Sequence, residues 1–127
     1  MKIDSIDHVV FTVKDIDATC QFYTAVLGME VVTFSENRKA LSFGSQKINL
    51  QQRGRESTLI AEKPTPGSAD VCFVTRVPVA EVIAHLKLCV FKPIGGPIER
   101  TGARGQMMSV YFRDPDMNLI EVSNYNP

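Results

Sequence analysis

The chain has 127 residues, of which 44% are hydrophobic, and its 14 basic and 14 acidic side chains cancel. This length fits one ordinary domain, and the balanced charge excludes the basic footprint of a nucleic-acid-binding protein and an electrostatic attraction to anionic membranes. We therefore expect small-molecule or protein partners, no nucleic acid and no membrane. No apolar run approaches the ~20 residues that cross a bilayer, and the polar start of the chain is unlike a signal peptide, so a cytoplasmic location is expected.

The first half of the chain predicts a βαβββ module. Residues 6–13 are rich in β-branched and aromatic side chains, which indicates a strand. Asp15 is a suitable N-cap, apolar residues then recur at helical spacing, and Gly28 is placed to end the helix, so 15–27 predicts an amphipathic helix. Turn-forming residues separate three further expected strands, over 29–34, 39–43 and 47–52.

The second half repeats this order after a proline- and glycine-containing linker over 54–68. Residues 69–75 predict a buried strand, and 78–88 predict an amphipathic helix with His85 on its solvent side. A flexible basic loop is expected over 100–105. Three strands are expected around it, within 91–99, 106–112 and 119–123.

The repeated order predicts an α+β fold of two pseudo-symmetric βαβββ modules with curled mixed sheets. We expect one domain, 1–127, with internal modules at about 1–53 and 69–127. In the best alignment of the two modules, Phe43 falls opposite Phe112.

The three cysteines, Cys20, Cys72 and Cys89, lie in apolar sequence surroundings and lack C-x-x-C spacing. This pattern is typical of reduced, buried thiols and does not indicate a disulfide framework or a zinc cluster.

Four polar residues occupy equivalent places in the two modules. Aligning the first strands places His8 opposite Asp70, and aligning the last strands places Asn49 opposite Glu121. An imidazole, two carboxylates and an amide oxygen are a suitable ligand set for Zn²⁺, Ni²⁺, Mn²⁺ or Fe²⁺. The alternative is structural: the histidine is hydrogen-bonded within its sheet, and the carboxylates meet solvent or basic side chains.

Glu121 carries the same ambiguity by itself. It lies between Ile120 and Val122, so in a strand its side chain points to the face opposite theirs. That face is either solvent-exposed or part of a cavity that the four polar residues share.

Three segments carry a resemblance to a known family: Asp7–Val13 (DHVVFTV), Phe22–Met29 (FYTAVLGM) and Phe112–Val122 (FRDPDMNLIEV). They resemble the vicinal oxygen chelate superfamily, which includes glyoxalase I, fosfomycin-resistance thiol transferases, extradiol dioxygenases, methylmalonyl-CoA epimerase and bleomycin-binding proteins. Within it, Arg38–Leu41, Arg100–Ala103 and Glu121–Tyr125 are closest to the glyoxalase domain-containing proteins. The resemblance covers nearly the whole chain and implies a glyoxalase-like fold and a homodimer, with the site within one chain or across two.

The resemblance implies His8 and Glu121 as metal ligands from the first and last strands. The two middle positions differ, because glyoxalase I has a glutamate and a histidine where this chain has Asn49 and Asp70. An amide cannot act as the general base of an enediolate mechanism, so classical glyoxalase I activity is not expected. The single histidine also departs from the two-histidine iron site of the dioxygenases.

The first hypothesis is a divalent-metal-dependent lyase or isomerase that acts on a small, oxygen-rich substrate, free or thiol-conjugated. Glu121 would be the displaceable ligand and proton shuttle, with His8, Asp70 and Asn49 completing the metal site. Substrate-binding residues for an anionic group are expected among Arg104, Arg100 and Arg38. The alternatives are a bleomycin-resistance-type binding protein without catalysis and a dimeric stress- or virulence-associated protein.

Overall fold

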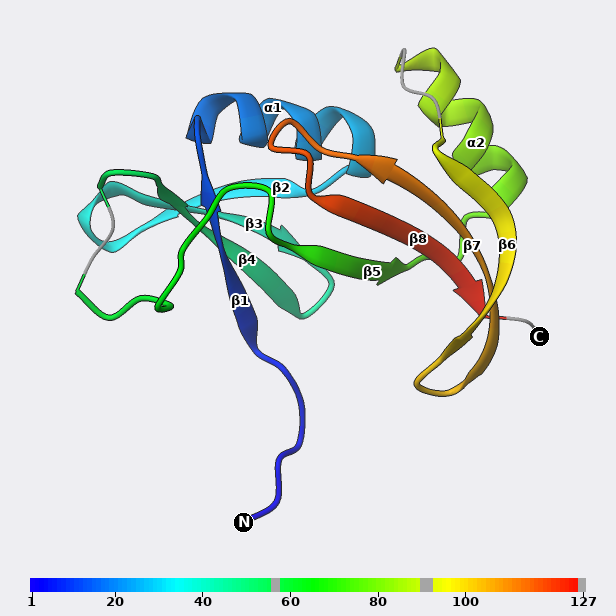
Figure 1. Cartoon of the computed structure of the whole chain (residues 1–127), viewed down its shortest axis with the longest axis horizontal. Helices are drawn as coiled ribbons and strands as arrows, with labels where there is room; N and C mark the ends of the chain where they lie inside the picture. Colours follow the sequence, from blue (N-terminus) through cyan, green and yellow to red (C-terminus); the bar gives the residue numbers. More distant parts are fainter. Residues whose placement is uncertain (56–57, 90–92, 126–127) are drawn as a thin grey trace. The chain divides into compact units, whose positions relative to one another are not determined.

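A strand, a helix and three more strands make up the first unit of the chain, residues 1–67 (Figure 1). The structure is a computed structural model that describes residues 1–55, 58–89 and 93–125. The elements of this unit are β1 (His8–Val13), α1 (Ile16–Leu27), β2 (Glu30–Phe34), a short 3-10 helix (Ser35–Asn37), β3 (Arg38–Phe43) and β4 (Gln46–Gln52).

Helix α1 begins and ends where the sequence predicts. The Asp15 side chain accepts hydrogen bonds from the backbone N–H groups of Asp17 (2.9 Å) and Ala18 (3.2 Å), which supplies the helix start with acceptors. Gly28 has a φ of 66°, in the left-handed region, and its N–H donates to Thr24. Because this conformation costs glycine almost nothing, the helix stops here and the chain turns into β2.

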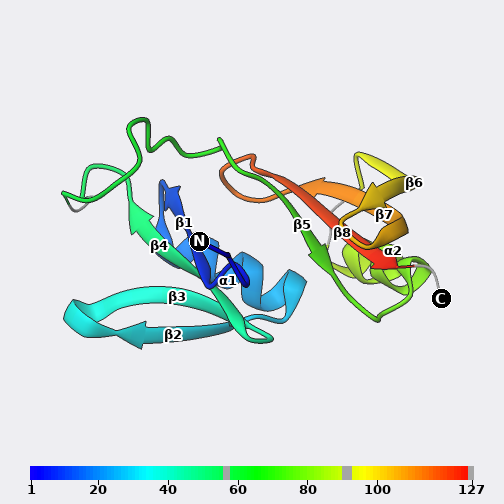
Figure 2. The same cartoon turned by 90° about the horizontal axis from the view of Figure 1, so that it is seen from below.

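The sheet of the first unit has the order β1-β4-β3-β2, with β1 parallel to β4 and the other pairs antiparallel. Strands β2 and β3 form a hairpin at one edge of it (Figure 2). The face toward α1 is apolar and closed, with Val13, Leu41 and Ile48 at most 1% exposed. Polar and basic side chains therefore gather on the opposite face, which we call the helix-free face of β1–β4; it carries His8, Val10, Phe34, Arg38, Ala40, Lys47 and Asn49.

The second unit, residues 68–127, repeats the arrangement. Its elements are β5 (Asp70–Val74), α2 (Val79–Leu88), β6 (Gly95–Gly102), β7 (Gly105–Arg113) and β8 (Leu119–Tyr125), in the sheet order β5-β8-β7-β6. Strand β5 is parallel to β8, as β1 is to β4. Helix α2 packs on β7 and β8, over the buried side chains of Val110, Phe112 and Ile120. The predicted α+β fold of two βαβββ modules is thus confirmed.

The strand register tests the alignment of the two modules. Val10 is the partner of Asn49 in the first unit, and Cys72 is the partner of Glu121 in the second, so the four polar residues do occupy equivalent positions. The pairing of Phe43 with Phe112 is wrong. Phe112 pairs with Ile120 on β8. Ile48 is the equivalent of Ile120 in the first unit and pairs with Leu41, so the equivalent of Phe112 is Leu41 and not Phe43. Cross-strand pairing sets the register, and a match of residue type cannot reveal a shift of two positions.

The basic segment 100–105 is not the loop that its glycines and charges suggest. Arg100, Thr101 and Gly102 are the last residues of β6 and pair with the start of β7, so only residues 103 and 104 form the turn. Gly105 has a φ of 130°, a conformation that residues with a side chain rarely adopt. The segment is therefore a tight hairpin with a glycine after its two-residue turn, and not the expected flexible loop.

The turn between β7 and β8 spans residues 114–118, as the run of turn-forming residues predicts. Asp114 accepts hydrogen bonds from the backbone N–H groups of Asp116 and Asn118, both at 2.9 Å, and from the Asn118 side chain at 2.8 Å. These contacts fix the loop before β8 and thereby the register of Glu121. Within the described ranges, no helix is long and apolar enough to cross a membrane.

Candidate functional site

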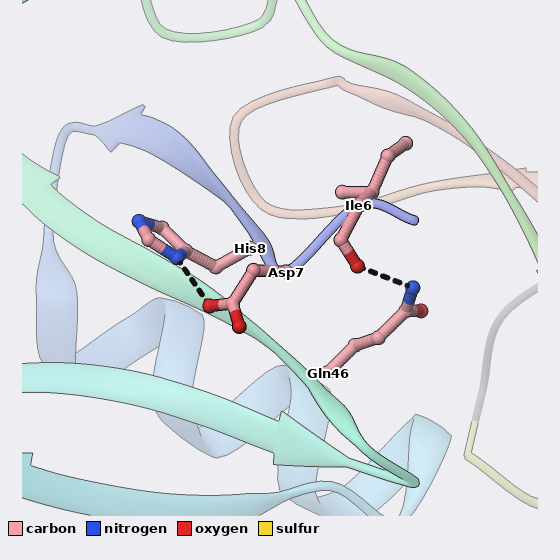
Figure 3. Close-up of polar contacts among 4 residues, drawn as sticks. All are labelled: Ile6, Asp7, His8 and Gln46. Carbon is pink, nitrogen blue, oxygen red and sulfur yellow. Dashed lines mark hydrogen bonds and ion pairs between the residues drawn. The ribbon is translucent and has the colours of Figure 1, made fainter. Parts of the chain in front are cut away.

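His8 is the first residue of β1 and its side chain is exposed. Its Nδ1 atom lies 2.7 Å from Oδ1 of Asp7, and the preceding carbonyl of Ile6 accepts a hydrogen bond from the Gln46 side chain (Figure 3). A carboxylate at Nδ1 favours the tautomer with the proton on that atom, which leaves the Nε2 lone pair available. This arrangement is the usual one for a histidine that binds a metal through Nε2.

Asn49 is 6% exposed, and its Oδ1 atom has no hydrogen-bond partner among the residues that the structure describes. The side chain lies on the helix-free face of β1–β4, between Val10 and Ala40. A buried carbonyl oxygen without a donor costs about 1–3 kcal/mol, so such an atom calls for an explanation. An oxygen of this kind is suited to receive a cation or the donor group of a ligand.

Two basic side chains meet an aromatic ring on the same face. The Nζ atom of Lys47 lies 4.1 Å from the centroid of the Phe34 ring, and the guanidinium carbon of Arg38 lies 4.9 Å from it. On this face, residues paired across neighbouring strands form rows. The row of Lys47 lies on one side of the row that contains Asn49, and the row of Phe34 lies on the other side. The contact between these two side chains therefore spans the Asn49 row.

Asp70 and Glu121 share a face of the second sheet, the one opposite α2. Asp70 is the first residue of β5 and is exposed. Glu121 is half-buried on β8, one row further along, while Ile120 and Val122 point to the other face and are at most 3% exposed. The apolar neighbours thus belong to the core, and the half-buried carboxylate lies on the helix-free face of β5–β8; the cavity shared by all four polar residues stays a prediction.

Two serines hold the Glu121 carboxylate. The hydroxyl of Ser109 donates to Oε2 at 2.6 Å, and the hydroxyl of Ser123 lies 3.3 Å from the same atom. Both serines are 0% exposed. Cys72, the partner of Glu121 on β5, places its sulfur 3.2 Å from the Ser123 hydroxyl.

The cysteines depart from the expected burial. All three are free thiols, but Cys72 is exposed and Cys20 and Cys89 are partly exposed. Burial of the sulfur raises the pKa of the Cys72 thiol, and the nearby negative charge of Glu121 adds to this, while the hydrogen bond with Ser123 lowers it. Partial burial likewise raises the pKa of Cys20. For Cys72, sequence context misled because its apolar neighbours in β5 point to the opposite face of the sheet; Cys20 and Cys89 lie in α1 and at the end of α2.

Arg100 and Arg104 lie at the β6–β7 hairpin, each beside a tyrosine. The Nε atom of Arg100 donates to the Tyr111 hydroxyl at 2.9 Å, and Tyr111 is the cross-strand partner of Glu121. The guanidinium of Arg104 lies 4.4 Å from the Tyr125 ring centroid, and its backbone N–H donates to the Tyr125 hydroxyl. Neither guanidinium forms an ion pair with a carboxylate of the described residues.

The candidate ligands are divided between the units: His8 and Asn49 share a face in the first, and Asp70 and Glu121 share a face in the second. Among the residues that the structure describes, no group of three His, Cys, Asp or Glu side chains is placed to hold a metal ion. The donor set itself fits a divalent cation, because each pair contains one residue with a supporting hydrogen bond, His8 with Asp7 and Glu121 with Ser109.

Sequence reasoning missed the supporting side chains. Ser109 and Ser123 belong to the same face as Glu121, and the two-residue step from Glu121 to Ser123 was a usable signal. Ser109 could be found only through the register of β7 with β8. Asp7, adjacent to His8, was visible in the sequence, but its contact depends on the side-chain conformation.

Comparison with known proteins gives a family match over most of the chain. The model of the Glyoxalase/Bleomycin resistance protein/Dioxygenase superfamily matches residues 5–122. The virulence protein STM3117 of Salmonella typhimurium is 54% identical over 98% of this chain and 87% of its own length. Its crystal structure has a TM-score of 0.97 and covers 99% of this chain and 100% of that chain.

Two further comparisons extend the range. The glyoxalase domain-containing protein RDO1 of Mycosarcoma maydis is 50% identical over 98% of this chain and 70% of its own length. The crystal structure of a lactoylglutathione lyase from Agrobacterium tumefaciens is 23% identical, with a TM-score of 0.74 over 98% of this chain and 96% of that chain. This last likeness concerns the fold alone.

Proposed function

The chain belongs to the Glyoxalase/Bleomycin resistance protein/Dioxygenase superfamily, and on this premise we propose that it is a divalent-metal-dependent lyase or isomerase that acts on a small, oxygen-rich substrate. The observation that carries the proposal is the repeated register. It gives two oxygen or nitrogen donors to the helix-free face of each sheet, at equivalent positions.

The surroundings of the donors support their role as ligands. The Asp7 carboxylate leaves Nε2 of His8 available, and Oδ1 of Asn49 is buried without a donor. Oε2 of Glu121 accepts hydrogen bonds from the Ser109 and Ser123 hydroxyl groups. With a carboxylate oxygen of Asp70, the proposed ligand set would consist of one nitrogen and three oxygens, which suits Mn²⁺, Fe²⁺, Ni²⁺ or Zn²⁺.

A divalent cation held by these residues would polarise adjacent oxygens of the substrate and stabilise negative charge that develops beside a carbonyl group. Glu121 would move the proton, because its carboxylate is half-buried and held by two serine hydroxyl groups, whereas Asp70 is exposed. Asn49 cannot share this task, since a neutral amide is not a base at physiological pH. The proposal therefore assigns general acid–base work to one carboxylate, not to two.

The arginines of the β6–β7 hairpin support an anionic substrate. Arg100 uses one N–H on Tyr111, next to Glu121, so its remaining guanidinium N–H groups can bind a carboxylate close to the reacting carbon. Arg104 and, in the first unit, Arg38 are the other cations that we propose for this purpose. Each is held against an aromatic ring.

Metal titration of the full chain tests the proposal. Protein purified without chelator is titrated with Mn²⁺ and Zn²⁺ by calorimetry, and its metal content is measured. We expect His8→Ala and Glu121→Gln to weaken binding at least tenfold. Their matched controls are His85→Ala, which removes the exposed histidine of α2, and Glu99→Gln, which removes a carboxylate on the other face of the second sheet. Less than about 0.1 equivalent of metal, with no binding on titration, would refute the metal-dependent reading.

The arginine assignment needs its own ligand. Oxalate is a suitable probe, because it is a small dianion with oxygens on adjacent carbons. In the presence of Mn²⁺, Arg100→Ala is expected to weaken oxalate binding about tenfold, and the exposed Arg76 supplies the control Arg76→Ala. Unchanged affinity in an Arg100→Ala, Arg104→Ala double variant would remove these residues from the substrate site.

The second candidate function is a small-molecule-binding protein of the bleomycin-resistance type, without catalysis. Asn49 favours it, because a neutral ligand weakens a metal site and a buried oxygen without a donor also suits an organic ligand. The two functions are distinguished by the metal titration.

We further propose a homodimer, and light scattering of the purified chain at micromolar concentration tests this.

A further inference from the structure

Glu121 and three neighbouring side chains, Cys72, Ser109 and Ser123, form a continuous polar cluster on the helix-free face of β5–β8. Cys72 lies across from Glu121 in the parallel pair, and Ser109 lies across from Ser123 in the antiparallel pair. The two serines are 0% exposed, so water does not compete for their hydroxyl groups. Cys72 is the exposed end of the cluster.

Each hydroxyl group carries one proton, and this fixes the direction of the hydrogen bonds. The ionised carboxylate of Glu121 can only accept, so Ser109 donates to Oε2 at 2.6 Å. The proton of Ser109 is then used, so Ser123 is the donor in their 2.6 Å contact; because its hydroxyl also lies 3.3 Å from Oε2 of Glu121, it shares its proton between the two acceptors. The thiol of Cys72 donates in turn to the Ser123 hydroxyl, at 3.2 Å.

We propose that Ser109 and Ser123 are positioning residues for Glu121, forming a directed hydrogen-bond chain that starts at the Cys72 thiol and ends on Oε2. This hydrogen-bond chain holds Oε2 of Glu121 within the sheet and leaves Oε1 as the atom that contacts a metal ion or substrate. This role rests on the proposed function of Glu121, but the hydrogen-bond chain itself does not.

Three other charged side chains lie on this face. Asp70 is on the same strand as Cys72, Arg113 lies across from Leu119, and Arg100 is engaged with Tyr111.

The chain is tested by proton NMR of the full-length protein. A buried hydroxyl that donates to a carboxylate at 2.6 Å should give a slowly exchanging, low-field proton resonance. We expect this resonance to disappear in Ser109→Ala, to move to higher field in Glu121→Gln, and to stay in Ser42→Ala, a half-buried serine on β3 of the first unit. If no such resonance exists, or if Glu121→Gln leaves it in place, the chain is refuted.

The positioning role is tested on the same variants by Mn²⁺ titration. Loss of a hydrogen bond to a ligating carboxylate typically weakens metal binding 10- to 100-fold, so Ser109→Ala should show a loss in that range and Ser42→Ala none. Ser109→Cys, which keeps a weak donor of similar size, should recover part of the affinity. Full wild-type affinity in Ser109→Ala refutes the positioning role. If the wild type binds no metal but shows the resonance, and the resonance responds to Glu121→Gln, the hydrogen-bond chain is supported and the metal function of Glu121 is refuted.

Discussion

Replacing Asn49 by leucine removes the buried oxygen that has no donor while keeping the volume of the side chain. Within the described part of the chain, Oδ1 is buried without a partner in a side chain that is 6% exposed, and the desolvation cost of such an atom is about 1–3 kcal/mol. The apolar replacement recovers most of this cost. We expect Asn49→Leu to raise the free energy of unfolding by about 1–2 kcal/mol and Tm by about 4–8 °C, measured in EDTA by urea and thermal denaturation.

The same substitution at Asn124 provides the contrast. That side chain accepts from the backbone N–H of Val79 and donates to the carbonyl groups of Thr75 and Val77. Asn124→Leu should therefore lower the free energy of unfolding by about 2–4 kcal/mol, since three backbone groups lose their partner.

A ligand role for Asn49 predicts a trade-off. In EDTA the Asn49→Leu variant should be the more stable protein, and saturating Mn²⁺ should stabilise it less than the wild type. A loss of more than about 1 kcal/mol in EDTA would show that Asn49 stabilises the fold by itself, and the reasoning from the unpaired oxygen would fail.

Three further predictions concern single sites. Because burial raises the pKa of Cys72, its alkylation by iodoacetamide at pH 8 should be slower than that of a cysteine in an unstructured peptide, as measured by peptide mass spectrometry. The alkylation should become faster in Glu121→Gln, which removes a negative charge beside the thiol, and an unchanged rate contradicts the prediction. A Cβ atom on Gly96, at φ 107°, would lie 2.5 Å from the Ser109 carbonyl oxygen, so Gly96→Ala should lower the free energy of unfolding by about 2–4 kcal/mol in urea denaturation. Gly105, at φ 130°, has no atom within 4 Å of such a Cβ, so Gly105→Ala should cost only the backbone strain of about 1–3 kcal/mol. Equal losses of stability would show that the contact at Gly96 is relieved. Asp15→Ala should destabilise by about 1 kcal/mol through loss of the N-cap of α1, and Asp15→Asn, which keeps the acceptor, should recover most of it.

Local sequence signals predicted those parts of the fold in which neighbouring residues decide the conformation. Asp15 and Gly28 fix the ends of α1 because capping needs only a side-chain acceptor and a left-handed residue. The turn over 114–118 likewise depends on its own polar side chains. The segment 100–105 was mistaken for a loop because glycines and charges are typical of loops, while the pairing of Arg100 with Met107 is a property of the hairpin.

The sequence by itself determined the two βαβββ modules and the equivalence of His8 with Asp70 and of Asn49 with Glu121, because hydrophobic periodicity and an internal repeat are both encoded along the chain. Only the tertiary structure decided what surrounds these residues. The support of Glu121 by Ser109 depends on the register of two strands, and so does the position of Asn49 between the apolar Val10 and Ala40. Both are contacts between residues distant in the chain, and the free energy of such contacts leaves no local pattern in the sequence.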